Sequence, residues 1–295
     1  MAKQLNATLD LLLDEAGFSD FQEEMVKILQ SAFAELSDNP SASLDEEAIR
    51  AASGLRALIK VPADEVPRSK EAYYEHLGEF QEFWQGLIDI ATRIPHNDDQ
   101  SQALVVKALG VLRGDSSMWK DFPDLGAMMR DKWVDPTFEW HPEDEELEPY
   151  TLSNWLNLNS FVARLHGSGV FLTNSFAVWQ LREGLEDDLV EAKGNCSPAE
   201  AVDNRIAVVS EWLVHAGPAL LKESLLESEN LDEGQKRAYG PGPLFSGRPG
   251  CNIERWGFWK RRLEELRPTI GASVAPSVDR AVQTMKASAA ALVRD

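Results

Sequence analysis

The amino-acid sequence predicts an all-α protein, a single multi-helix globular array of about ten to twelve helices. Apolar residues recur at helical spacing along most of the 295 residues. No stretch alternates apolar and polar residues over the length that a half-buried strand requires. No segment repeats at a period of roughly 20–50 residues, which argues against a regular repeat solenoid.

The first 67 residues are expected to form an N-terminal helical layer. Amphipathic patterns predict three helices there, at residues 5–16, 20–36 and 44–59. Ser43 begins the third helix and Glu46 follows three residues later, the spacing of a capping box. Three short helices bury too little apolar surface to fold alone, so this layer is not expected to be an independent domain.

Residues 68–295 are expected to form the main helical domain. The clearest helix start in the chain is Ser197, with Pro198 at the first helical position and Glu200 at the third. The expected helices cover residues 69–93, 99–113, 123–132, 173–190, 252–266 and 277–293, with further helices beginning at residues 151, 198 and 218.

A turn-rich loop followed by a helix with two tryptophans is expected to organise this domain. Residues 240–250 contain four glycines and three prolines, so they cannot form a helix or a central strand. Asn252 is a favourable N-cap for the helix that follows, whose apolar face carries Trp256 and Trp259. We therefore expect the loop to deliver both rings into the core.

The charge of the chain excludes several classes of partner. A formal net charge of -20 argues against nucleic-acid binding and against an anionic membrane surface, because both need clustered Lys and Arg. Two cysteines, Cys196 and Cys251, are too few for a disulfide framework, which favours a reducing compartment, the cytoplasm. No secretory signal or transmembrane span is recognisable. The oligomeric state is left open.

Three segments together resemble an uncharacterised all-helical family of filamentous fungi, a domain of unknown function. They are residues 154–165, residues 176–179 with Arg182 and Leu185, and residues 242–250 continuing into Arg255, Trp256 and Lys260. The resemblance covers residues 70–266, and the spacing of Gly and Pro makes the third segment the most specific. The resemblance implies a soluble intracellular fungal protein and transfers no catalytic residues.

Tryptophans with polar groups at their margin suggest a small-molecule pocket, since such pockets combine apolar walls with a few convergent polar groups. The candidate ligand-binding residues are Trp155, Asn159, His166, Trp179, Arg182, Arg248, Arg255, Trp256 and Trp259. The expected function is cofactor-independent binding in an aromatic pocket, as a biosynthetic enzyme or accessory of fungal specialised metabolism. The alternative is that these rings are only packed core, with Arg255 bonded to a loop carbonyl.

A second hypothesis is that the protein is a magnesium-dependent prenyl diphosphate cyclase. Asp187, Asp188 and Glu191 resemble the aspartate-rich motif with which class I terpene cyclases hold Mg²⁺, a hard cation that prefers oxygen ligands. Mg²⁺ is the cofactor only under this reading. The three acids follow Leu185 at the expected end of a helix, where solvated carboxylates are common, so we expect them to face water. A third reading is a non-enzymatic interaction or scaffold protein.

Overall fold

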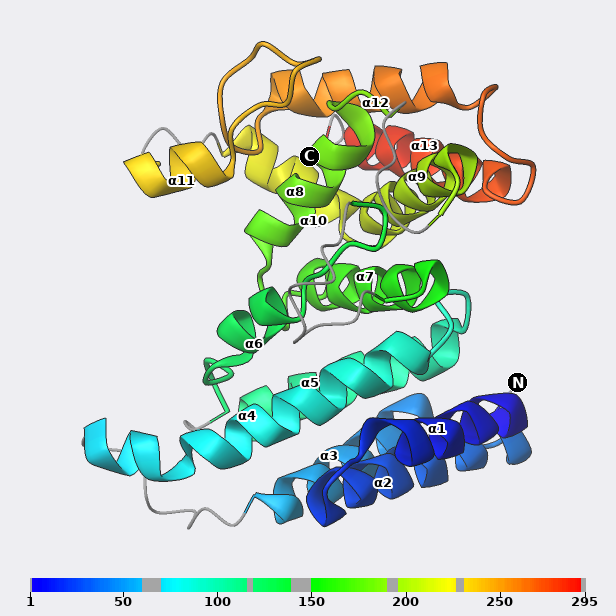
Figure 1. Ribbon diagram of the computed structural model, residues 1–295, viewed down its shortest axis with the longest axis vertical. Coiled ribbons are helices and arrows are strands. Elements are labelled where there is room, and N and C mark those ends of the chain that lie inside the picture. Colours follow the sequence, from blue (N-terminus) through cyan, green and yellow to red (C-terminus); the bar gives the residue numbers. More distant parts are fainter. Residues whose placement is uncertain are drawn as a thin grey trace. The chain divides into compact units, whose positions relative to one another are not determined.

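The computed structural model describes residues 2–59, 70–115, 119–138, 150–189, 196–226 and 231–292. In these ranges the chain forms thirteen α-helices and no strand, which confirms the all-α prediction (Figure 1). The chain divides into two compact units, Met1–Val134 and Asp135–Asp295. Within the described ranges, none of the helices combines the length and apolar character needed to cross a bilayer.

The first unit contains six helices in its described part. They are α1 (Ala2–Ala16), α2 (Asp20–Asp38), α3 (Leu44–Leu58), α4 (Lys70–Arg93), α5 (Asp99–Asp115) and α6 (Leu125–Asp131). The segment expected as an N-terminal layer provides α1, α2 and α3. In the structure α3 packs on α2 and α5, and α4 packs on α1, α2 and α6.

An aromatic cluster fills the core of this unit between α4 and the segment that precedes α6. Its rings meet edge to face with centroids 4.8–5.9 Å apart, the geometry that aromatic quadrupoles favour. The members are Phe80, Phe83, Trp84, Trp119 and Phe122. The indole N–H of Trp84 donates to the carbonyl oxygen of Pro123 at 2.6 Å, so burying this ring leaves no donor unpaired.

The second unit contains seven helices in its described part. They are α7 (Leu152–Gly167), α8 (Asn174–Leu185), α9 (Pro198–His215), α10 (Gly217–Leu225), α11 (Glu233–Ala238), α12 (Ile253–Leu266) and α13 (Ala275–Leu292). Helix α9 packs against α7, α8, α10 and α13, and α12 packs against α8, α10 and α13. The core of the unit therefore forms around α9.

Three of the helix starts predicted from local sequence are present, and the one predicted at Ser69 lies outside the described residues. Ser197 forms the full capping box with Glu200, and Pro198 occupies the first turn of α9. The side chain of Asn252 accepts a hydrogen bond from the backbone of Arg255 at the start of α12. Ser43 caps α3 by accepting from the backbone N–H of Glu46. These contacts span only three residues, which is why the sequence predicts them.

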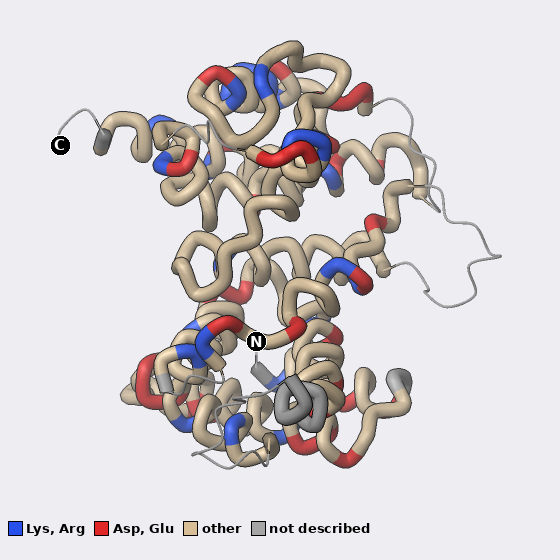
Figure 2. Tube along the Cα trace, turned by 90° about the vertical axis from the view of Figure 1, so that its left-hand side faces the viewer, with Lys and Arg blue, Asp and Glu red and all other residues tan. Residues whose placement is uncertain are grey.

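Charged residues are spread over the described surface of both units. Figure 2 shows Lys and Arg interspersed with the more numerous Asp and Glu along the helices of each unit. The excess of Asp and Glu agrees with the net charge of -20.

Candidate ligand-binding site

The loop at residues 239–252 is closed on itself by hydrogen bonds. The N–H of Gly250 donates to the carbonyl oxygen of Tyr239 at 3.0 Å, which joins the two ends of the loop. Gly250 has a φ of 92°, a left-handed conformation that strongly favours glycine. Near the end of the loop, Nδ2 of Asn252 donates to the carbonyl oxygen of Arg248 at 3.0 Å.

Arg255 holds this loop from the first turn of α12. Its side chain is fully buried, and all five of its N–H donors are used within the protein. Two donate to the carboxylate of Glu186, at 2.6 Å from Nε and 3.0 Å from Nη2. The other three donate to the carbonyl oxygens of Tyr239, Gly240 and Gly250 at 2.8–3.1 Å. The guanidinium therefore fixes the path of the loop.

Glu186 is the buried counterion of Arg255 and follows directly after α8. Besides the two bonds from Arg255, its carboxylate accepts from Nε1 of Trp259 at 2.6 Å and from the N–H of Gly242 at 2.8 Å. A Cβ at Gly242 would lie 2.7 Å from the Cβ of Glu186, so the close approach requires glycine. Four donors stabilise the buried carboxylate, which offsets the cost of removing it from water.

The clamped loop forms one wall of a cavity of about 320 Å³. This volume is at the lower end of the range for small-molecule sites. The other walls come from α8, α10 and α11, together with Leu226 directly after α10 and Leu231 shortly before α11. The lining residues are Asn174, Val178, Glu223, Leu226, Leu231, Gln235, Tyr239, Gly250 and Cys251.

Two of the residues that line this cavity carry a buried acceptor atom without a donor. Oε2 of Glu223 and Oδ1 of Asn174 are buried and have no hydrogen-bond partner among the described residues. Burial, followed by the negative charge of Glu223, raises the pKa of Tyr239 above its usual value, so the phenol stays protonated at neutral pH. A carboxylate and an amide oxygen without donors make the cavity complementary to a ligand that brings N–H or O–H groups.

His166 lies behind Glu223, at the end of α7. Its ring is fully buried, and Nδ1 accepts the backbone N–H of Thr173 at 3.0 Å. Because an amide N–H can only donate, the imidazole proton is on Nε2, which faces Oε1 of Glu223 at 3.4 Å. Gly167 allows α7 to end this close to α9, since a Cβ there would lie 1.9 Å from the carbonyl oxygen of His215. His166 thus faces one oxygen of Glu223, and the other oxygen has no hydrogen-bond partner among the described residues.

Cys251 contributes a protonated thiol to the cavity wall. Burial raises its pKa to about 11, and the Ser224 hydroxyl, 3.0 Å from Sγ, only partly offsets this effect. The thiol also lies 3.3 Å from the carbonyl oxygen of Leu220. A thiol with this pKa is almost entirely protonated at pH 7, so Cys251 is unsuited to nucleophilic chemistry.

The four tryptophans of the predicted pocket are packed into the unit to different degrees. Trp155, Trp256 and Trp259 are almost completely buried, whereas Trp179 is half-buried. Nε1 of Trp179 donates to the carbonyl oxygen of Ala238 at 3.0 Å, immediately before Tyr239. Trp179 therefore supports the segment that presents Tyr239 to the cavity.

The remaining predicted residues have separate environments. Asn159 is buried, accepts from Nε1 of Trp212 at 2.9 Å and donates to the carbonyl oxygen of Trp155 at 3.0 Å. Arg182 is half-buried on α8, and Arg248 is exposed on the loop. None of the nine predicted residues lines the 320 Å³ cavity formed by the described residues. Three of the nine are in contact with the cavity wall from behind. His166 faces Glu223, and Arg255 bonds the carbonyl oxygens of Tyr239 and Gly250. Trp179 bonds the carbonyl oxygen of Ala238, the residue before Tyr239.

Several residues of the site have no signal in the sequence analysis. Asn174 and Glu223 read as ordinary helix residues, and Glu186 reads as the first member of a solvated acidic run. Tyr239 precedes the Gly/Pro loop directly, and Cys251 follows it. Their position beside the loop is the one sequence feature that could have drawn attention to them.

The structure does not bring the three acids of the cyclase hypothesis together in one described site. These acids are Asp187, Asp188 and Glu191. Asp187 is half-buried, and burial raises its pKa while Arg182 partly offsets the effect. Asp188 is exposed, and Glu191 lies outside the described residues. In the part of the chain that the structure describes, no three His, Cys, Asp or Glu side chains are placed to hold a metal ion together.

Glu183, in the last turn of α8, makes the stability of the unit depend on pH. Burial, followed by the charge of Asp135, raises its pKa from 4.5 to about 8, and Arg182 and Arg205 offset this only in part. The unfolded chain would ionise this group near pH 4.5, so the folded state holds an extra proton between pH 4.5 and about 8. Stability attributable to Glu183 is complete at low pH and falls as the pH rises through this window.

We expect Glu183→Gln to remove this loss. The difference in unfolding free energy between the variant and the parent should grow by about 1–2 kcal/mol from about pH 5.5 to about pH 8.5. This value is smaller than the full pKa shift implies, because Glu183 is partly solvated. Urea denaturation at the two pH values measures the difference. Glu254→Gln, an exposed acid on α12, is the control and should show no pH-dependent gain. A constant difference between Glu183→Gln and the parent at both pH values would contradict the expectation.

The fold and the cavity define an all-helical protein with a cavity of about 320 Å³ in which two buried acceptor atoms lack donors among the described residues. Residues 84–263 match the model of the DUF3632 family, described as proteins of unknown function. This segment is more than half of the chain, so the protein belongs to the DUF3632 family. No curated protein and no solved structure matches the chain. All residues that line the 320 Å³ cavity lie within the segment that matches the family.

Proposed function

We propose that this protein binds a small organic cation, a protonated amine with an apolar body, in the cavity at Glu223. The observation that carries the proposal is the buried Oε2 of Glu223, which has no hydrogen-bond partner among the described residues. Val178, Leu226 and Leu231 supply apolar wall beside this carboxylate. A charged acceptor beside apolar side chains is complementary to an ammonium group on an apolar body.

The other polar groups support the same class of ligand. Oδ1 of Asn174 is a second acceptor without a partner in the described structure, and the hydroxyl of Tyr239 can accept from a further donor. Among the described residues, no Lys or Arg lines this cavity. The net charge of -20 also raises the local concentration of cations around the protein.

The cellular role is part of the proposal. We propose that the protein acts without a metal or cofactor, as a biosynthetic enzyme or an accessory protein of fungal specialised metabolism in the cytoplasm. The sequence resemblance to a fungal family and the two cysteines, neither in a recognisable disulfide framework, support this context. Amines with apolar bodies are a ligand class compatible with such a role.

Calorimetric titration with a matched pair of probes tests the ligand class. Phenethylamine is protonated at neutral pH, and 2-phenylethanol has the same body without the charge. We expect Glu223→Gln to weaken phenethylamine binding about tenfold or more, because one charge-assisted hydrogen bond is lost, and to leave 2-phenylethanol nearly unchanged. Glu254→Gln removes the same charge from an exposed position outside the cavity lining and should leave both affinities unchanged.

The same titrations separate the alternatives. Equal binding of the two probes, or an equal loss in both glutamine variants, would contradict recognition by Glu223. Binding of a non-hydrolysable prenyl diphosphate that requires Mg²⁺ and is lost in Asp187→Asn would favour the cyclase reading. Absence of binding for every probe would favour the scaffold reading.

A further inference from the structure

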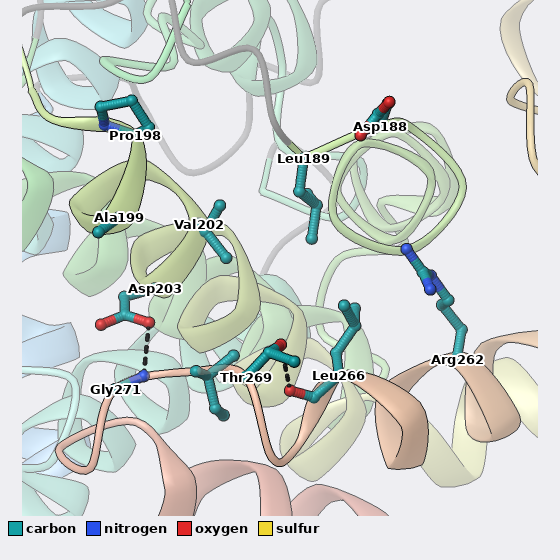
Figure 3. Close-up of a pocket in the computed structure, with 11 residues that line it drawn as sticks. Asp188, Leu189, Pro198, Ala199, Val202, Asp203, Arg262, Leu266, Thr269 and Gly271 are labelled. Carbon is teal, nitrogen blue, oxygen red and sulfur yellow. Dashed lines mark hydrogen bonds between the residues drawn. The ribbon is translucent and has the colours of Figure 1, made fainter.

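The C-terminal unit has a second cavity, of about 610 Å³, whose chemistry differs from that at Glu223 (Figure 3). Its walls are formed by two residues that follow α8, the first turns of α9, the last turns of α12 and the segment after α12. The lining residues are Asp188, Leu189, Pro198, Ala199, Val202, Asp203, Arg262, Leu266, Thr269, Ile270 and Gly271. The volume is sufficient for a ligand of drug-like size.

Most of this lining is apolar. Figure 3 shows the side chains of Leu189, Val202 and Leu266 extending toward a common space from three different segments. The hydroxyl of Thr269 donates to the carbonyl oxygen of Leu266 at 2.8 Å, so this polar group is already satisfied within the wall. The centre of the cavity is therefore suited to the apolar body of a ligand.

Arg262 lines this cavity and carries an unsatisfied donor. Its Nε is buried and has no hydrogen-bond partner among the described residues. The guanidinium makes an ion pair with Glu265, but Nη1 is 3.5 Å from Oε2, which is long for a hydrogen bond. A buried N–H without an acceptor is costly, so a ligand with a suitably placed oxygen atom would be stabilised here.

The charges of the lining residues favour a neutral ligand oxygen over a carboxylate at this position. Asp188 and Asp203 contribute two carboxylates against the single guanidinium of Arg262. Oδ1 of Asp203 accepts the backbone N–H of Gly271 at 2.8 Å. A ligand carboxylate would be repelled by both acids, whereas a neutral carbonyl oxygen could accept from Nε of Arg262 without this repulsion.

We propose that this cavity is a second binding site, for an uncharged and mainly apolar molecule that carries a carbonyl group. The apolar body lies against Leu189, Val202 and Leu266, and the carbonyl oxygen accepts from Nε of Arg262. This site is independent of the cation site at Glu223, because the two cavities have no lining residue in common.

A series of naphthalene probes of similar size tests each part of the assignment by fluorescence or calorimetric titration. 2-Acetonaphthone has a neutral carbonyl, 2-ethylnaphthalene lacks it, and 2-naphthoate replaces it with a carboxylate. We expect the ketone to bind about tenfold more tightly than either of the other two, the usual effect of one hydrogen bond to a charged donor. The hydrocarbon should still bind through its apolar body.

Two variants locate the site. Arg262→Met keeps a long side chain without donors and should reduce the affinity for 2-acetonaphthone to that for 2-ethylnaphthalene. Arg261→Met is the matched control, because Arg261 is the exposed neighbour and is not among the lining residues. Val202→Trp fills the cavity from a half-buried position on α9 and should abolish binding of all three probes. Circular dichroism melts show whether each variant is folded.

Several outcomes would overturn the proposal. These are tighter binding of 2-naphthoate than of the ketone, equal effects of Arg261→Met and Arg262→Met, unchanged binding in folded Val202→Trp, and no binding of any probe to the parent. Glu223→Gln should leave the affinity for 2-acetonaphthone unchanged. Failure at one cavity can therefore be distinguished from failure at the other.

Discussion

Replacing Arg255 with methionine is expected to lower the free energy of unfolding of the C-terminal unit by about 3–5 kcal/mol. The guanidinium and the Glu186 carboxylate are both fully buried. Removing the guanidinium leaves a carboxylate in the core with only the donors of Trp259 and Gly242. It also leaves three loop carbonyl groups without their donors. The loss should therefore reach the range measured for a broken buried ion pair.

An exposed ion pair in the same unit provides the control. Arg267 makes two hydrogen bonds of 2.8 Å to Asp279, but both side chains are largely exposed to solvent. Arg267→Met should lower the free energy of unfolding far less than Arg255→Met does, because water screens the pair and solvates whichever partner remains. Unfolding in urea is monitored by hydrogen-exchange mass spectrometry of peptides from α12. These peptides report on the C-terminal unit separately from the first unit.

The double variant Glu186→Leu with Arg255→Met distinguishes pairing from simple packing. If the two charges mainly compensate each other, the double variant should lose clearly less than the sum of the single variants. Additive losses would mean that each residue acts alone. A loss below 1 kcal/mol in Arg255→Met would contradict the role of the guanidinium as the clamp of the loop.

The fold class could be predicted because its determinants are local. Helical periodicity and caps depend on residues three or four positions apart, as at Ser197 with Glu200 and at Asn252 with Arg255. Helix α11 was missed, since Glu233–Ala238 is short, polar and without an apolar face. Its stability comes from a capping box at Asp232 and from tertiary contacts such as that of Trp179 with Ala238.

The site could be predicted only in part, because its contacts join distant residues. Glu186 and Arg255 are 69 residues apart. One hypothesis from the sequence is that Arg255 bonds a carbonyl of the Gly/Pro loop, and the structure contains such bonds. The sequence does not indicate which acid pairs with Arg255. Glu186 is followed by Asp187 and Asp188, and this run resembles a solvated helix end. Whether an acid in such a run is buried depends on the loop that covers it.

The cavity residues were missed for a related physical reason. Glu223 becomes notable only because His166, at the end of a different helix, faces one of its oxygens. Asn174 becomes notable only because its amide oxygen is buried without a donor among the described residues. An unsatisfied acceptor is a property of the packed structure, and no spacing in the sequence indicates it.

Trp256→Ala is the second substitution with a large expected effect, a loss of about 3–5 kcal/mol in the free energy of unfolding of the C-terminal unit. The indole is almost completely buried on α12. A methyl group at Gly217 would lie 3.7 Å from Cη2 of Trp256, so the ring packs closely against the start of α10. Truncation would leave a cavity between α12 and α10 that the surrounding backbone can fill only in part.

Ile253→Ala, three residues earlier on α12, is the matched control. Ile253 is also a large apolar residue, but its side chain is 48% exposed. Its truncation should change the unfolding free energy by less than about 0.5–1 kcal/mol, because little buried apolar surface is lost. Thermal melts and hydrogen exchange of α12 peptides measure both variants. If Trp256→Ala melts within a degree or two of the parent, the ring is not part of the core, and α12 does not have the organising role that its sequence predicts.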